Sequence, residues 1–202
     1  MNGETPAAIL KSNLWTNNPI FIQILGICST LAITNNLVNT LIMTLAVVFV
    51  TGLSNTTVSV LKSLIPRKVR MIVQTLIIAF YVILVDIVIR AFLPEISKAL
   101  GPYVGLIITN CIIMGRAEAF AQLNPPIMAL WDGLTSGAGY MAVLVVIAII
   151  RELLGAGSLL GYQILGAGFT TWTIMVMPPS AFFLLGTLIW VAKTIMIRKE
   201  ST

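Results

Sequence analysis

Histidine is absent from this chain, and cysteine occurs only twice among its 202 residues. Without histidine, His-ligated haem and Rieske-type iron centres are excluded. Two thiols alone also argue against a structural zinc site, which takes four Cys or His ligands. The sequence has no GxGxxG motif and no lysine-bearing P-loop, so we expect dinucleotides to bind elsewhere.

Charge is equally scarce. Only 9% of the residues are charged and 58% are hydrophobic, whereas average proteins have about 25% charged residues. Residues 12–61 and 153–192 carry no charge at all. Such runs could not cover the surface of a soluble domain, so the sequence indicates an integral membrane protein. The first 18 residues lack an apolar core before a cleavage site, and we therefore expect no removable signal peptide.

Apolar segments divide the chain into six stretches, at residues 19–34, 39–61, 71–93, 102–115, 136–150 and 177–197. The first and fourth are shorter than the roughly 20 residues that span a bilayer as a helix. Three segments followed by three place the halves in opposite orientations. We therefore predict an all-α membrane protein, one domain over residues 1–202, with six transmembrane segments. The predicted arrangement is a 3+3 inverted repeat, about 19–98 and 99–197, with short broken helices one and four.

Basic residues predict the orientation in the membrane. Lys62, Arg67, Lys68 and Arg70 cluster between the second and third segments, and such clusters face the cytoplasm. Six crossings then place both termini in the cytoplasm. We expect a multi-pass protein of the bacterial inner membrane.

The two cysteines occupy matching places in the halves. Cys28 and Cys111 each follow a proline by nine residues, with a common offset of 83. Short interrupted segments at matching positions are typical of a site near the membrane midplane. The thiols could be small buried hydrophobic groups, or a disulfide. They could also be two of the four thiolates of a [2Fe–2S] cluster, the other two coming from a partner.

Ionisable residues within the apolar segments are candidates for function. Asp86 lies deep in the third segment and Asp132 at the start of the fifth. Either could bind sodium, balance a moving charge, or pair with a cation of another subunit. We expect Arg116 and Glu118 to cap the broken helix or brace a partner, and residues 151–152 to form pairs at a subunit interface.

Several stretches resemble one family of membrane subunits. The family contains the D subunit of the sodium-translocating NADH:quinone oxidoreductase and the E subunit of the Rnf electron-transport complex. The most specific stretch is Asn-Cys-Ile-Ile-Met-Gly-Arg-Ala-Glu-Ala-Phe at residues 110–120. The others are residues 26–29, 43–47, 105–109, 151–157 and 179–183.

The resemblance implies six membrane segments and a homologous partner of inverted topology. In that family each member contributes two cysteines to one shared intramembrane [2Fe–2S] cluster, and Cys28 and Cys111 match those positions. The chain would then be one component of a multisubunit, sodium-translocating NADH:quinone (ubiquinone) reductase, not catalytic alone. Its partners would be flavin-bearing and NADH-oxidising subunits and the lipid bilayer, with no nucleic acid.

Three further points follow. Residues 132–139 are similar to the covalent-flavin motif of sister subunits, but Gly139 replaces the acceptor hydroxyl, so we predict no covalent flavin on this chain. Residues 51–55 favour the quinone reductase, with an Rnf E-type subunit of a ferredoxin:NAD oxidoreductase as the alternative. A self-contained secondary transporter with inert cysteines is the other alternative.

Overall fold

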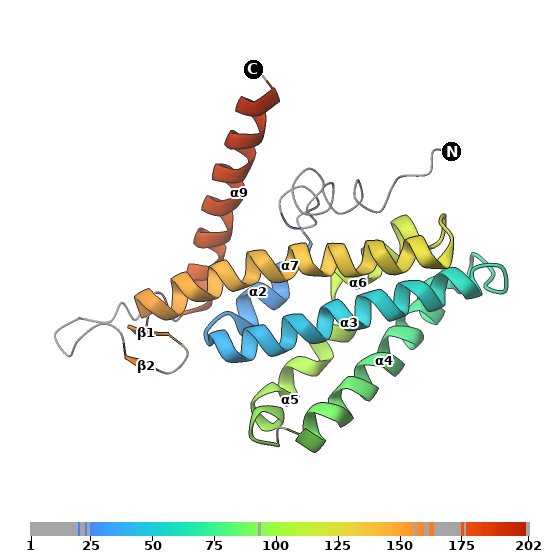
Figure 1. Ribbon diagram of the computed structural model, residues 1–202, viewed down its shortest axis with the longest axis horizontal. Coiled ribbons are helices and arrows are strands. Elements are labelled where there is room, and N and C mark those ends of the chain that lie inside the picture. The colour runs from blue at the N-terminus through green and yellow to red at the C-terminus, as the bar shows by residue number, and fades with distance from the viewer. Residues whose placement is uncertain are drawn as a thin grey trace.

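The computed structural model describes residues 20, 23, 25–92, 94–155, 157–159, 162–163, 175 and 177–200, and most of these described residues are helical. Figure 1 shows their arrangement. The helices are α2 (Ile27–Ile33), α3 (Leu37–Leu61), α4 (Arg70–Phe92), α5 (Pro94–Ile108), α6 (Cys111–Arg116), the π-helical η2 (Ala117–Ala121), α7 (Pro126–Gly155) and α9 (Pro178–Glu200). Strands β1 (Ser158–Leu159) and β2 (Tyr162–Gln163) form a two-residue antiparallel ladder.

Five stretches of the described chain are long and apolar enough to cross a membrane. They are Leu37–Leu61, Arg70–Phe92, Gly101–Ala121, Pro126–Gly155 and Pro178–Ile195. In the first predicted segment, residues 19, 21, 22 and 24 lie outside the described residues, and the helical part that is described is the short α2. The helical membrane fold is therefore confirmed, while the sixth crossing and the 3+3 inverted repeat stay predictions.

Helices α3 and α7 form the centre of the bundle and run side by side in opposite directions (Figure 1). Glycines of α7 permit their backbones to touch. A Cβ atom at Gly133 would lie 2.8 Å from the Thr51 carbonyl oxygen, and one at Gly137 would lie 2.9 Å from the Val48 Cα. Small residues at a helix crossing are the usual means of close packing in membranes. The fifth segment was predicted to begin at residue 136, but α7 begins ten residues earlier, because its small and polar residues face α3 instead of lipid.

Polar contacts fix both ends of the α3–α7 pair. At one end, Glu152 Oε2 accepts a hydrogen bond from the Leu37 N–H at 2.7 Å, which satisfies a free donor at the start of α3. At the other end, the Asn124 carbonyl accepts from Ser59 Oγ at 2.6 Å and from Lys62 Nζ at 2.9 Å. These contacts hold the two central helices in register along their whole length.

The fourth segment is interrupted, as its short length predicted. Helix α5 ends at Ile108, and Asn110 is extended (φ −66°, ψ 120°) before α6 begins at Cys111. Pro102 does not cause the break, since it lies inside α5. The break is instead stabilised by Asn110, whose Oδ1 accepts from the Ile112 N–H at 3.1 Å and caps α6.

Candidate functional site

The two cysteines, 83 positions apart in the sequence, stand side by side. Cys111 is the first residue of α6 and Cys28 the second residue of α2. Their side chains lie within hydrogen-bonding reach of each other. Both are free thiols and both are exposed on the surface of this chain. The fold thus delivers one thiol from each half of the sequence to a single surface point.

Backbone donors face the same point. The Gly26 N–H and the N–H of Cys111 itself are within hydrogen-bonding reach of the Cys111 sulfur. Gly26 has a φ of 86°, in the left-handed region, and comes directly before α2. The Gly26 donor thus comes from the cap of the helix that carries the other cysteine.

Two thiolates are half of the ligand set that a [2Fe–2S] cluster takes. Among the residues that the structure describes, no three His, Cys, Asp or Glu side chains gather to hold a metal ion. The sequence has no third cysteine, so a group that takes four thiolates would need two of them from another chain. The exposure of both sulfurs permits that second chain to approach. The donor set fits a group shared between two chains.

A buried tyrosine supports the thiol pair, and the sequence reasoning missed it. Tyr140, in the middle of α7, is 1% exposed, and its hydroxyl contacts the Ser29 hydroxyl. It also lies beside Asn110, the cap of α6. A single tyrosine in an apolar helix belongs to no sequence motif. The only signal in the sequence is its hydroxyl, which needs a hydrogen-bond partner when the residue is buried.

Asp132, a candidate for the ion path, is fully buried and paired within its own chain. Its carboxylate accepts from Arg116 Nε at 2.9 Å, and a second contact joins Arg116 Nη2 to the other oxygen. Phe120 lies under the same guanidinium, with its ring centre 5.5 Å from Cζ. Arg116 therefore binds α7 rather than capping the broken helix.

The surroundings of Asp132 contain unused polar groups. The amide atoms of Asn55 and the hydroxyl of Ser136 are buried without a hydrogen-bond partner in the described part of the chain. Asn55 lies close to α7, since a Cβ at Gly133 would be 3.1 Å from its Nδ2. Asp132 precedes Tyr140 by eight residues, about 12 Å along a helix axis. This polar region is thus separate from the thiol pair.

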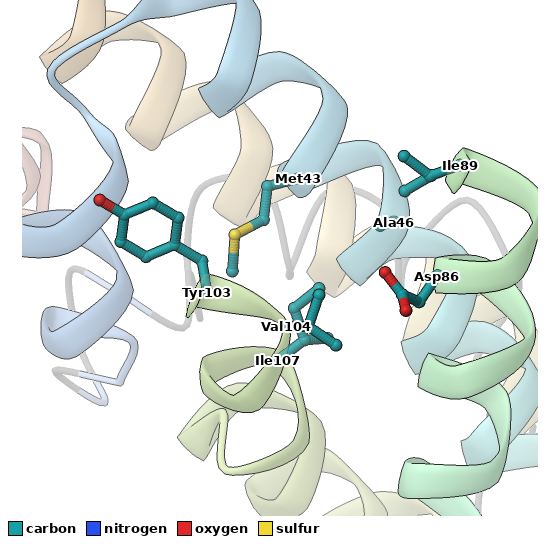
Figure 2. Close-up of a pocket in the computed structure, with 7 residues that line it drawn as sticks. All are labelled: Met43, Ala46, Asp86, Ile89, Tyr103, Val104 and Ile107. Atoms are coloured by element: carbon teal, nitrogen blue, oxygen red, sulfur yellow. The ribbon is translucent and has the colours of Figure 1, made fainter. Parts of the chain in front are cut away.

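Asp86 lies in a small cavity between α3, α4 and α5, drawn in Figure 2. The cavity of about 20 Å³ has room for one water-sized species. Its remaining lining is apolar except for the Tyr103 hydroxyl, which points away from Asp86 (Figure 2). The carboxylate pairs with Arg90, one turn later on α4, at 2.9 Å. Asp86 therefore offers one carboxylate as a ligand and already has a cation beside it.

Glu118 and the residues 151–152 make contacts within the chain. Glu118 pairs with Arg70 and accepts from Gln74 Nε2 at 3.0 Å, which joins η2 to α4. The Arg151 guanidinium donates to Thr34 Oγ1 at 2.5 Å and to the Met177 carbonyl at 3.3 Å. Within the chain, residues 151–152 fasten α7 to the ends of α2, α3 and α9, while their pairing across a subunit interface stays a prediction.

These features define a class: a polytopic helical membrane protein in which broken helices bring two thiols together. Comparison with known proteins is more specific. Residues 7–189 match the Rnf-Nqr family, described as "Rnf-Nqr subunit, membrane protein". The chain belongs to this family, which confirms the resemblance found in the sequence.

Three relatives illustrate how closely the chain matches, and each is named as the D subunit of a Na(+)-translocating NADH-quinone reductase. The protein of Psychromonas ingrahamii is 50% identical over 93% of this chain and 91% of its own length. That of Pseudomonas paraeruginosa is 49% identical over 92% and 86%, and that of Shewanella woodyi is 46% identical over 96% and 95%.

Proposed function

We propose that this chain is the D-type membrane subunit of a sodium-translocating NADH:quinone oxidoreductase. Relatives of that name are 46–50% identical over nearly the whole chain, which supports the proposal. The reaction belongs to the whole complex, in which flavin-bearing and NADH-oxidising subunits supply the hydride acceptor. The Rnf E-type alternative draws support only from the shared family, whereas these relatives are named as quinone reductase subunits.

Cys28 and Cys111 are proposed to be two of the four thiolate ligands of one [2Fe–2S] cluster. The observation that carries this assignment is their side-by-side placement on the surface of the chain. A homologous subunit of inverted topology supplies the other two thiolates. The bound cluster supplies one-electron transfer across the membrane. The chain itself fixes the two sulfurs side by side on its surface and directs the Gly26 N–H at the Cys111 sulfur.

The orientation follows from the basic residues. Both termini lie in the cytoplasm of a bacterial inner membrane, and each half crosses three times. A reporter fused within residues 63–69 then reads cytoplasmic, and one within residues 94–98 reads external. The reverse result would overturn the orientation.

Sodium is proposed to pass near Asp86 or Asp132. Asp86 lines a cavity of single-ion size and pairs with the exposed Arg90, whereas Asp132 is fully buried and could accept a cation only when Arg116 releases it. Replacing Asp86 by Asn should leave the complex assembled and shift the sodium dependence of turnover to higher concentration. An unchanged sodium titration in an intact complex removes Asp86 from the path.

The cysteine assignment is tested by Cys28→Ser and Cys111→Ser in the purified complex. Each should lose the intramembrane iron and its reducible signal, and quinone turnover with them. Oxidation of NADH by an artificial acceptor should persist, since the other cofactors stay bound. The matched control is Thr109→Ser, which changes an exposed residue beside α6. Full quinone turnover in either cysteine variant contradicts the assignment and favours a role without a cluster.

A further inference from the structure

One continuous set of contacts links the start of α2 to the start of α6. Ser29 Oγ donates to the Gly26 carbonyl at 3.0 Å. A hydroxyl has a single proton, so the Tyr140 hydroxyl must donate to Ser29 in their mutual contact. The Tyr140 oxygen is then left as an acceptor.

Asn110 is the donor that fits this acceptor. Its side chain lies next to the Tyr140 hydroxyl, and its Oδ1 is used by the Ile112 N–H. Its Nδ2 is buried and makes no hydrogen bond among the described residues, so it is available to the Tyr140 oxygen beside it. The hydrogen bonds run from Tyr140 to Ser29 and from Ser29 to Gly26, and such chains of hydrogen bonds strengthen one another.

The ring of Tyr140 acts on the same glycine. A Cβ atom at Gly26 would lie 2.7 Å from the Tyr140 Cε2, so the aromatic ring is packed directly against the backbone of Gly26. The N–H of this glycine reaches the Cys111 sulfur. Tyr140 thus touches the cap residue of each cysteine-bearing helix, from a central helix that carries neither cysteine.

We propose that Tyr140 is a positioning residue for the thiol pair. Its hydroxyl binds the first turn of α2 and lies beside the cap of α6, and this placement sets how Cys28 and Cys111 stand relative to each other. The proposal rests on the function given above, in which the pair is a ligand set. It predicts, however, a property of the thiols themselves that can be measured without the cluster.

The variant Tyr140→Phe isolates the hydroxyl, because it keeps the ring against Gly26. The full chain is produced in membranes without its partner subunits and oxidised with diamide, and closure of the intrachain Cys28–Cys111 disulfide is followed by loss of maleimide-labelled thiols. Diamide accepts the two electrons and two protons that the thiols release. We expect closure in the variant to be about tenfold slower, since rates depend steeply on alignment of the reacting atoms.

A second tyrosine provides the matched control. The Tyr81 hydroxyl contacts Thr57 Oγ1 at 2.7 Å between α3 and α4, and Tyr81→Phe should close at the wild-type rate. Ser29→Ala removes the next member of the chain of contacts and should slow closure like Tyr140→Phe. If Tyr140→Phe does not fold, the closure rate of Ser29→Ala tests the proposal in its place. Wild-type closure in both Tyr140→Phe and Ser29→Ala, or equal slowing in Tyr81→Phe, overturns the proposal.

The assembled complex gives an independent readout. Tyr140→Phe should retain iron but shift the g values of the reduced cluster, because the ligands are no longer held at the same angle. An unshifted spectrum contradicts the proposal. If instead Cys28→Ser and Cys111→Ser keep their iron, the proposed function fails, while the disulfide rates still decide whether Tyr140 positions the thiols.

Discussion

Helix α2 begins after a glycine and α6 after an asparagine, although each presents a cysteine in its first turn. Gly26 provides no side-chain cap, and the hydroxyls of Ser29 and Thr30 turn back to its carbonyl instead. Asn110 caps α6 directly. Each half therefore places its cysteine in the first turn of a short helix, but the residues that stabilise the start of the two helices differ.

The far ends of these helices differ in the same manner. Helix α6 ends in its own Arg116, which pairs with Asp132 of α7. Helix α2 is capped at its end by Thr34, whose hydroxyl accepts from Arg151 of α7. The cation of the first contact, Arg116, belongs to the short helix α6, whereas the cation of the second, Arg151, belongs to α7. Helix α7 is the common support, so variants at each contact should show which helix depends on it more.

The largest effect is expected at the end of α6. Arg116→Met leaves the Asp132 carboxylate buried without its cation, and losing one partner of a buried pair costs about 3–5 kcal/mol. Detergent unfolding of the purified chain measures the loss. Arg90→Met, which removes an exposed arginine from Asp86, is the control and should change stability by less than about 1 kcal/mol. Equal losses of stability in Arg116→Met and Arg90→Met would show that the buried ion pair contributes no more than the exposed one.

The matching change at the end of α2 is Arg151→Met. It removes the donors to Thr34, Met175 and Met177. The short bond to Thr34 is worth about 1.5–3 kcal/mol, and the two carbonyl contacts, at 3.2 and 3.3 Å, are longer and add less. Because Thr34 is the C-cap of α2, we expect looser packing of α2 as well as lower stability. Faster maleimide labelling of Cys28 than of Cys111 would report it. Equal labelling of both cysteines would contradict a selective effect on α2.

At the start of α2, Gly26→Ala should cost about 1–2 kcal/mol for the left-handed backbone. The clash with Tyr140 adds to this, and unfolding measurements give the sum. Gly105→Ala in α5 is the matched control, since nothing lies within 4 Å of its Cβ position. Gly105→Ala should leave the stability unchanged or raise it. A loss of stability there as large as for Gly26→Ala would show that the left-handed backbone of Gly26 is not the cause.

The smallest effect is expected for Asn110→Ala at the start of α6. Loss of an N-cap costs about 1 kcal/mol, partly offset here because an unsatisfied buried donor also disappears. Asn36→Ala, at the exposed cap of α3, is the comparison in the same unfolding assay. A loss at Asn110 as large as that for Gly26→Ala would show that the two starts depend equally on their caps.

Much of this arrangement could be predicted from local signals. Low charge predicted the membrane helices, and the short fourth segment predicted a break near Cys111. The Asp132–Arg116 pair could not be predicted, because it joins two separate helices. Which side chains of α6 and α7 face each other depends on the conformation of the chain between them. The start of α7 was misplaced for a related reason, since Gly133 and Gly137 serve contact with α3 and lower the apolar signal.

The π-helical turn η2 has a consequence for tolerance of insertion and deletion. An α-helix advances about 100° per residue, and the wider π-helical turn holds one residue more. Arg116 faces α7, and Glu118, two positions later and so about 200° further round the helix, faces α4. Deleting Ala117, the residue between them, would leave the two side chains only about 100° apart and turn one of them away from its partner. The chain could then keep its contact with α7 or with α4, but not with both.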